Sequence, residues 1–149
     1  SLVSAALRTH HLDSSILNEL TPASDLHVSG DKRRLGRALS NLLTNGIHYG
    51  GGVTSVSIST EDQLVQIAIE DEGPGVPTTE RSKIFDRFSR GASAGQRGDD
   101  TGSGLGLSMV HEDIRLHGGQ VWVEDRNDGK SGARFVIELP MTAEGELDL

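Results

Sequence analysis

Two asparagine residues one helical turn apart, Asn41 and Asn45, have the most informative spacing in the sequence. At about 100° per residue, Asn41, Asn45 and His48 fall on one stripe of a predicted helix, beside its leucines, so we expect them to line the rim of a cleft. An amide carbonyl is a hard oxygen ligand, and Mg²⁺ held between a protein and a triphosphate needs only one or two protein oxygens. The pattern favours a magnesium and phosphate site, although solvated asparagines on a helix would have the same spacing.

A carboxylate at the end of an alternating apolar stretch is the second candidate group. Asp71 opens the turn Asp71-Glu72-Gly73-Pro74-Gly75, and period-two geometry puts its side chain on the apolar face of the preceding strand. It could accept a hydrogen bond from an exocyclic amine such as that of adenine, while Gly73 and Gly75 let backbone and base approach closely. An ordinary Asp-x-Gly turn is the alternative.

Three alternating glycines, Gly102, Gly104 and Gly106, precede a second predicted helix. Bare backbone amides and a helix N-terminus are suited to wrap polyphosphate oxygens. The stretch before them, Ser89 to Thr101, has no apolar periodicity and cannot bury enough surface to hold itself still, so we expect a flexible lid over about residues 89–103. A loose hinge without a ligand is the alternative.

The elements that must position these groups follow from local patterns. The surest helix begins after Asp31, a good N-cap candidate, and stops at Gly50-Gly51-Gly52. Apolar alternation predicts a hairpin after it and a closing pair of strands that ends at Pro140. The other predicted elements are a helix over Leu2–Leu12, an edge strand over Ser14–Leu20, a fragment over Leu26–Val28, hairpin strands around Val56–Ile58 and Val65–Ile69, a helix over Leu107–His117, and strands over Val121–Glu124 and Ala133–Leu139.

Length and composition narrow the possible classes. The 149 residues fit one domain, predicted over residues 1–142 and followed by a frayed acidic tail over residues 143–149. The formal net charge of -8 disfavours nucleic acid and anionic membranes as partners. The chain has no cysteine for disulfides or thiolate metal sites, and no stretch approaches the roughly 20 apolar residues that cross a bilayer. We therefore expect a soluble cytoplasmic module, although a fragment of a membrane-anchored protein would look the same.

Four motifs, in this order, resemble the catalytic domain of sensor histidine kinases. Asn41-Leu42-Leu43-Thr44-Asn45 resembles the N box, Asp71 to Gly75 the Asp-x-Gly-x-Gly box, Phe85-Asp86-Arg87-Phe88 the F box, and Gly102 to Leu107 the glycine-rich lid box. Together with His117-Gly118-Gly119, Gly132 to Phe135 and Leu139-Pro140, the likeness extends from Asp31 to Pro140. The resemblance implies an α+β fold of the Bergerat ATP-binding type, a two-layer sandwich in which helices cover one face of a mixed, mainly antiparallel sheet.

The same resemblance implies Mg²⁺ and ATP as cofactors and gives roles to individual residues. Asn45 is the implied metal ligand, Asn41 supports the phosphates, Asp71 recognises adenine and Tyr49 stacks near the base. No catalytic residue is implied in this chain. The implied nucleotide-binding set is Asn41, Asn45, His48, Tyr49, Asp71, Gly73, Gly75, Thr101, Gly102, Ser103, Gly104, Leu105 and Gly106.

Residues around the F box have less definite implied roles. Arg87 and Arg90 either approach the phosphates or dock a partner domain, and both remain open. Phe85 and Phe88 are expected to pack the base of the lid rather than contact the nucleotide.

Two positions depart from the family pattern. The family usually has Ala after the second asparagine, where this chain has Gly46, and a Lys or Arg often precedes the aromatic residue, where this chain has His48. A glycine inside a helix costs about 1 kcal/mol relative to alanine, so the end of this helix is expected to fray and to weaken ATP binding. A histidine that is largely neutral near pH 7 would weaken contact with the terminal phosphate.

The position of Asn41 bears on the reaction. Related ATPases of the heat-shock chaperone and mismatch-repair type carry a glutamate one turn before the magnesium asparagine, so hydrolysis by that route is disfavoured here. Transfer to an external histidine fits better, since phosphoryl transfer is mostly positioning and electrostatic stabilisation. No histidine followed by an acidic residue precedes Leu7-Arg8-Thr9, and His10 and His11 are expected to be exposed. The implied partners are an upstream dimerisation and phosphotransfer domain and, indirectly, a response regulator; the isolated domain is expected to be a monomer.

Other interpretations of the motifs are weaker. Asp100-Thr101-Gly102-Ser103 copies an aspartic protease signature, but those enzymes need two such carboxylates. His111-Glu112 opens a zinc-protease pattern, but position 115 is Arg rather than His. A serine kinase of the anti-sigma type would have glutamate at the position of Asn41. The main alternative is a non-catalytic ATP-binding or partner-binding module on the same fold.

Overall fold

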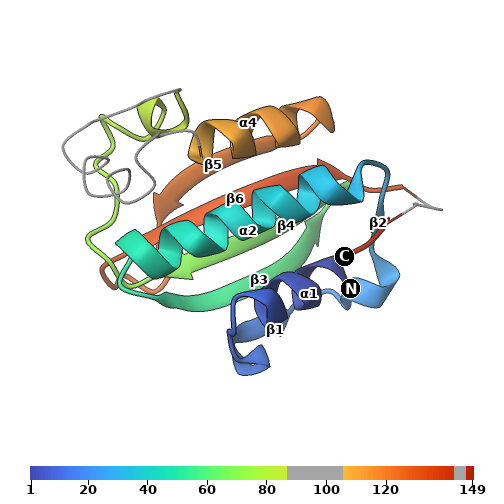
Figure 1. The fold of residues 1–149 in the computed structure, drawn as a ribbon, viewed down its shortest axis with the longest axis horizontal. Helices are drawn as coiled ribbons and strands as arrows, with labels where there is room; N and C mark the ends of the chain where they lie inside the picture. Colours follow the sequence, from blue (N-terminus) through green and yellow to red (C-terminus); the bar gives the residue numbers. More distant parts are fainter. Residues whose placement is uncertain (87–105, 143–146) are drawn as a thin grey trace.

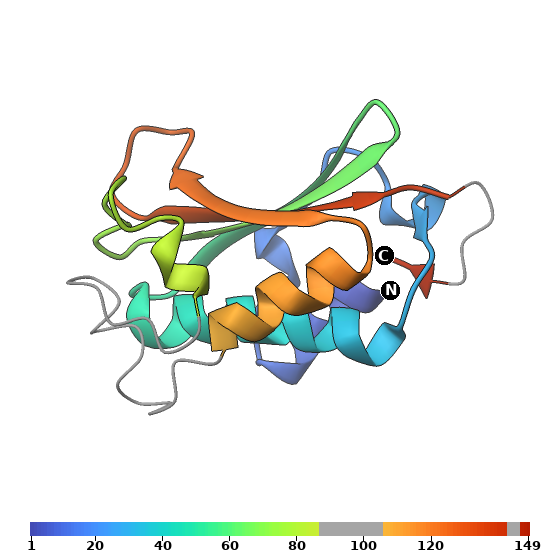
Figure 2. The same ribbon diagram turned by 90° about the horizontal axis from the view of Figure 1, so that it is seen from above.

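The computed structural model describes residues 1–86, 106–142 and 147–149. Figures 1 and 2 show two layers, in which helices α1 (Leu2–Thr9), α2 (Lys32–Tyr49) and α4 (Gly106–Leu116) lie on one face of a sheet. The sheet has the order β1-β3-β4-β6-β5, and all its pairings are antiparallel except that of β1 with β3. Its strands are β1 (Leu17–Glu19), β3 (Val53–Glu61), β4 (Leu64–Asp71), β5 (Gln120–Asp125) and β6 (Ala133–Pro140). The predicted α+β, two-layer fold is confirmed.

Helix α2 is the element that the sequence predicts most directly. The Asp31 carboxylate accepts hydrogen bonds from the backbone amides of Arg33 and Arg34, at 2.9 and 3.3 Å, and so caps the first turn. Five of its apolar side chains are buried against the sheet and the neighbouring helices: Leu35, Ala38, Leu39, Leu42 and Leu43. The helix continues three residues beyond Gly46 to Tyr49, and the Gly50 amide donates to the Gly46 carbonyl at 3.1 Å. Gly46 therefore does not interrupt the helix, and the fraying expected there stays a prediction.

The hairpin of β3 and β4 positions Asp71, which is the last residue of β4. Ile58 pairs with Ile67 and Val56 with Ile69, and these side chains lie in the core. Because successive strand residues point to opposite faces, Asp71 follows Ile67 and Ile69 into the interior and is only 1% exposed. The inward orientation predicted for its carboxylate is confirmed.

The N-terminal elements are shorter than predicted. Helix α1 ends at Thr9, and the expected strand over Ser14–Leu20 begins instead with a single 3₁₀ turn, η1 (Ser14–Ile16). The Asp13 carboxylate accepts from the Ser15 amide at 2.8 Å and stabilises that turn, which is why only Leu17–Glu19 forms a strand. The predicted position at the sheet edge is correct.

The expected frayed tail is wrong for the last three residues. Strand β7 (Leu147–Asp148) pairs antiparallel with β2 (His27–Val28) in a second small sheet. Leu149 is fully buried, and its carbonyl accepts from the Val3 amide at 3.0 Å, so the two termini lie side by side (Figures 1 and 2). The physical reason is that Leu147 and Leu149 are apolar residues in an otherwise acidic segment and find a place in the core.

The remaining short elements are η2 (Ala23–Asp25) and η3 (Lys83–Phe85). Within the described parts of the chain, no helix is both long and apolar enough to cross a membrane.

Candidate functional site

The polar stripe of α2 has a buried centre and an exposed end. Asn45 is 6% exposed, Asn41 is half-buried and His48 is exposed. Among the described residues, the Asn45 side-chain nitrogen has no hydrogen-bond partner. A buried amide without a partner costs about 1–3 kcal/mol, so Asn45 fits a site in which a bound group completes its contacts. The amide oxygen of its side chain is the kind of metal ligand that Mg²⁺ prefers.

Asn41 joins this stripe to the start of α4. Its side-chain nitrogen donates to the carbonyl of Gly106 at 3.4 Å, across 65 residues of sequence. Gly106 is the first residue of α4 and the last of the predicted nucleotide-binding glycines. The N box and the end of the glycine run therefore meet in space, as the sequence interpretation requires.

The carboxylate of Asp71 is held by backbone amides. Its Oδ1 accepts from the Gly73 amide at 3.1 Å and from the Ala133 amide at 3.0 Å. The first of these bonds belongs to the turn itself, whereas the second comes from the start of β6, 62 residues away. The two donors belong to rigid backbone and keep the side chain in one orientation.

Two glycines make room for Asp71. A Cβ atom on Gly50 would overlap the Asp71 carboxyl group, and one on Gly132 would overlap the Asp71 carbonyl oxygen. The Gly50 carbonyl also accepts from the Glu72 amide at 2.9 Å, so the end of α2 and the end of β4 are in direct contact. The glycine run that ends α2 therefore packs directly against the turn that begins at Asp71.

The turn between β5 and β6 supports the same segment from the other side. Arg126 donates from Nη1 to the Asp71 carbonyl at 3.0 Å, and the Ser131 hydroxyl donates to the Gly73 carbonyl at 2.7 Å. Arg126 also pairs with Asp128 at 2.6 Å, and this hydrogen bond raises the pKa of the guanidinium and lowers the pKa of the carboxyl. Sequence reasoning missed Arg126 and Ser131, because their turn chemistry gives no sign of which distant strand they contact.

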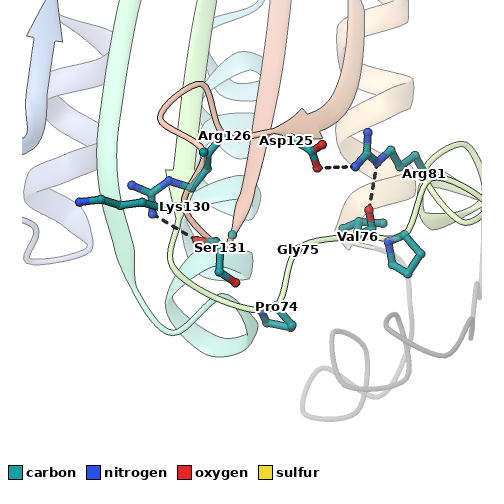
Figure 3. Close-up of a pocket in the computed structure, with 11 residues that line it drawn as sticks. Pro74, Gly75, Val76, Arg81, Asp125, Arg126, Lys130 and Ser131 are labelled. Carbon is teal, nitrogen blue, oxygen red and sulfur yellow. Dashed lines mark hydrogen bonds and ion pairs between the residues drawn. The ribbon is translucent and has the colours of Figure 1, made fainter.

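An open pocket of about 570 Å³ lies between this turn and the segment Pro74–Pro77 (Figure 3). Gly75, predicted to bind nucleotide, is in its wall, and Arg81 crosses it to donate to the Val76 carbonyl at 3.0 Å and to pair with Asp125 at 2.6 Å. Two of its three cationic side chains, Arg81 and Arg126, are therefore committed to partners within the fold. The lining residues are Pro74, Gly75, Val76, Pro77, Arg81, Asp125, Arg126, Gly129, Lys130, Ser131 and Gly132.

The space beside the Cα of Gly46 is filled by a neighbouring side chain. A Cβ atom added there would lie 2.7 Å from Cγ2 of Val53 and 3.8 Å from Cβ of Asp71. A β-branched residue in a strand cannot easily turn its methyl away. Val53 therefore fills the space that an alanine methyl would take.

Tyr49 and Phe85 are two aromatic residues of the predicted motifs that lie in the described part of the chain. Tyr49 is half-buried, and its ring centroid lies 6.2 Å from that of His48 at a tilted angle of 57°. Phe85 is buried and meets Phe135 edge-on at 6.2 Å, with His111 at 6.3 Å. Phe85 thus packs in the core, while the lid at whose base it was expected to pack lies outside the described residues.

Several predicted residues lie outside the described part of the chain. They are Thr101, Gly102, Ser103, Gly104 and Leu105 of the nucleotide set, together with Arg87, Phe88, Arg90 and the expected lid over residues 89–103. Among the described residues, the structure places Asn41 in contact with Gly106 and Asp71 in contact with Gly73. The bond from the Glu72 amide to the Gly50 carbonyl joins the end of α2 to the end of β4, and the rings of His48 and Tyr49 lie near each other in the last turn of α2.

Comparison with known proteins agrees with this geometry. Residues 30–143 match the sequence family described as "Histidine kinase-, DNA gyrase B-, and HSP90-like ATPase". The chain is 36% identical over 122 residues to the signal transduction histidine-protein kinase AfsQ2 of Streptomyces coelicolor, an alignment that covers 82% of this chain and 22% of that protein. The chain thus corresponds to about a fifth of this relative's length.

Two solved structures are similar over nearly the whole chain. Full-length ShkA in complex with AMPPNP has a TM-score of 0.72 and 25% identity, covering 99% of this chain and 31% of that one. The histidine kinase ThkA in complex with the response regulator protein TrrA has a TM-score of 0.65 and 27% identity, covering 95% and 38%.

Proposed function

This chain belongs to the family of histidine kinase-, DNA gyrase B- and HSP90-like ATPases, and on that premise we propose that it binds Mg²⁺-ATP and supplies the γ-phosphate to a histidine on a separate domain. The observation that carries the proposal is the meeting of three distant segments at one end of the fold. Asn41 and Asn45 come from α2, Asp71 from the end of β4, and Gly106 from the start of α4.

The residues present suit this ligand. The Asp71 carboxylate, fixed by the Gly73 amide, has the chemistry to accept from an amino group on a base, and the buried residue Asn45 has an amide oxygen suited to a hard cation. Asn41, fixed to Gly106, lies between them and the start of α4, where backbone amides favour phosphate. When bound, Mg²⁺ would neutralise phosphate charge. The AMPPNP present in the ShkA structure supports ATP as the nucleotide.

The choice between transfer and hydrolysis rests on the residue at position 41. A general base must take a proton from the attacking water, and the carboxamide of Asn41 cannot do so. The site can bind and align a nucleotide, but among the described residues nothing in the Asn41–Asn45 stripe activates water. An external nucleophile is therefore proposed, and a histidine is favoured because the similar proteins AfsQ2 and ThkA are named histidine kinases.

The proposal extends to partners and organisation. We infer a histidine-bearing dimerisation domain elsewhere in the full-length protein and a response regulator as the next recipient, which the ThkA–TrrA complex supports by analogy. A catalytic domain over residues 1–142 with a lid over about 89–103, a cytoplasmic location and a monomeric isolated domain remain proposals of the same kind.

Titration of the chain with AMPPNP, with and without Mg²⁺, tests binding. We expect Mg²⁺ to tighten binding by about tenfold, and Asn45→Ala to remove that dependence, since one magnesium ligand is lost. Asn18→Ala is the matched control, because Asn18 is an exposed asparagine of β1. Unchanged Mg²⁺ dependence in the Asn45 variant would contradict the site assignment.

A second experiment tests transfer. The chain is mixed with γ-labelled ATP, Mg²⁺ and a separately expressed dimerisation domain from a relative such as AfsQ2. Label on that domain's histidine supports the kinase. Tight ATP binding without label on any histidine would instead favour the non-catalytic module.

A further inference from the structure

A second buried aspartate, Asp113, lies on α4 and faces α2. Its side chain is fully buried and accepts three hydrogen bonds from two arginines of α2. Arg37 bonds both carboxylate oxygens, from Nε at 3.0 Å and from Nη2 at 2.7 Å, while Arg34 donates at 3.2 Å. Such a forked arrangement fixes the direction of both side chains as well as their distance.

The two arginines are only half-buried, with side chains 46% and 45% exposed. The hydrogen bond to Asp113 raises the pKa of Arg37, so the guanidinium keeps its charge. A buried ion pair adds little net stability over apolar packing, because its desolvation offsets the attraction. What it does add is a fixed register between the helices that carry it.

Two further contacts lie on either side of this pair. At one end, the Asp31 amide donates to Nε2 of His117 at 2.9 Å, and His117 Nδ1 lies 2.6 Å from the Asp113 carbonyl. At the other end, Asn41 holds the carbonyl of Gly106. Residue 31, the N-cap of α2, and residues 37 and 41 of the helix thus face residue 117, just beyond α4, and residues 113 and 106 within it, which is the order expected of antiparallel helices (Figure 1).

The Arg37–Asp113 bond is the central contact of this ladder and lies one helical turn from Asn41 along α2. Arg37 and Asn41 are four residues apart and Asn45 follows after four more, so all three lie on one stripe. A shift of α4 along α2 would move Gly106 away from Asn41 without any change in the residues that contact ligand.

We propose that Arg37 and Asp113 are positioning residues for the phosphate end of the nucleotide site, because their bond sets where the first turn of α4 stands relative to Asn41 and Asn45. The inference rests on the proposed nucleotide function. The base end of the site, built from Asp71, Gly50 and the β5–β6 turn, has no contact with this pair among the bonds of the described residues. Contacts to phosphate therefore depend on the pair, and contacts to adenosine do not.

The test is a comparison of two ligands on variants of the whole chain. The double variant Arg37→Met/Asp113→Leu replaces the ion pair by apolar side chains, an exchange that is often neutral for stability. We expect its Kd for Mg²⁺-AMPPNP to rise about five- to tenfold, while its Kd for adenosine changes less than about twofold and its thermal midpoint stays close to wild type. Arg37→Lys keeps the positive charge but loses the forked pair of hydrogen bonds. Its Kd for Mg²⁺-AMPPNP is expected to lie between those of the wild type and the double variant.

Arg33→Met is the matched control, since Arg33 is an exposed arginine of the same helix turn. If the double variant fails to fold, Asp113→Asn, which preserves size and one acceptor, is measured in the same way. Equal weakening for both ligands, or no weakening for AMPPNP, overturns the positioning role. If the wild type binds neither ligand, the proposed function itself fails, and the two failures are thereby distinguished.

Discussion

Asp71 and Asp113 are both aspartates with less than 2% exposure, yet the molecule treats them differently. Asp71 ends a strand, and its Oδ1 accepts from two backbone amides. Asp113 lies inside a helix and accepts from the guanidinium groups of Arg34 and Arg37. Backbone amides fix the Asp71 carboxylate at the turn that ends its strand, whereas two arginines connect Asp113 to the neighbouring helix and suit the joining of two helices.

Loss of the Asp71 charge is expected to have the largest effect. In Asp71→Asn, one acceptor oxygen becomes a donor, so either the amino group of the base or a backbone amide loses its partner. We expect nucleotide affinity to fall about 100-fold, or about 2.7 kcal/mol, measured by titration with AMPPNP. Asp113→Asn should weaken the same affinity far less; equal losses would erase the distinction between the two carboxylates.

Removal of one arginine is expected to act on stability. Arg37→Met leaves the fully buried Asp113 with Arg34 alone, and a buried charge without sufficient partners is destabilising. The free energy of unfolding should fall by about 2 kcal/mol in a urea titration, whereas Arg33→Met changes it by less than about 0.5 kcal/mol. An unchanged free energy of unfolding in Arg37→Met would show that the bond between Arg37 and Asp113 does not stabilise the fold.

Packing beside Asp71 can be tested at Gly46. Gly46→Ala gains about 1 kcal/mol of helix propensity but forces its methyl against Val53, for which overpacking costs of about 1–3 kcal/mol are usual. We expect a net loss of about 1 kcal/mol, with weaker AMPPNP binding because Asp71 is displaced. In Gly46→Ala/Val53→Ala the clash is absent. The loss of unfolding free energy in the double variant should therefore be smaller than the sum of the losses in the two single variants. Strict additivity would show that the two residues do not share this space.

A third aspartate, Asp31, allows a pH test of carboxylates held by backbone amides. Hydrogen bonds from the Arg34 and Arg33 amides lower its pKa from the ordinary value of 3.8. A depressed folded-state pKa adds stability above the unfolded value and loses it as the pH falls through the folded value. The thermal midpoint of Asp31→Ala should thus be below wild type at pH 7, and the two should converge below pH 3.8. A constant difference across that range would contradict the assignment.

The predictable parts of the fold are those whose cause is local. Asp31, the leucines and the glycine run define α2 because capping and helical periodicity act over a few residues. Alternation likewise turns Asp71 inward on β4. The error at the C-terminus arose because two leucines in an acidic segment carry too little local pattern to indicate the small sheet with β2.

The unpredicted parts depend on contacts between distant segments. Asp113 is a polar residue on a helix, and such residues are usually solvated, so nothing local marks it as buried. Arg126 and Ser131 belong to a turn whose own sequence explains its shape but not its contact with Asp71 and Gly73. At Gly46, the sequence suggests a weakness, whereas the space is filled by Val53.

The sequence by itself determined which groups are able to bind magnesium, phosphate and base, because the chemistry of asparagine, aspartate and bare glycine backbone belongs to the residues and their spacing. The tertiary structure alone decided where those groups stand relative to one another, through Gly50 and Gly132 against Asp71 and through Arg37 and Asp113 between the helices. The reason is that steric fit and buried hydrogen bonds arise only when segments distant in the sequence are packed together, as with Asp71 and Ala133, which are 62 residues apart.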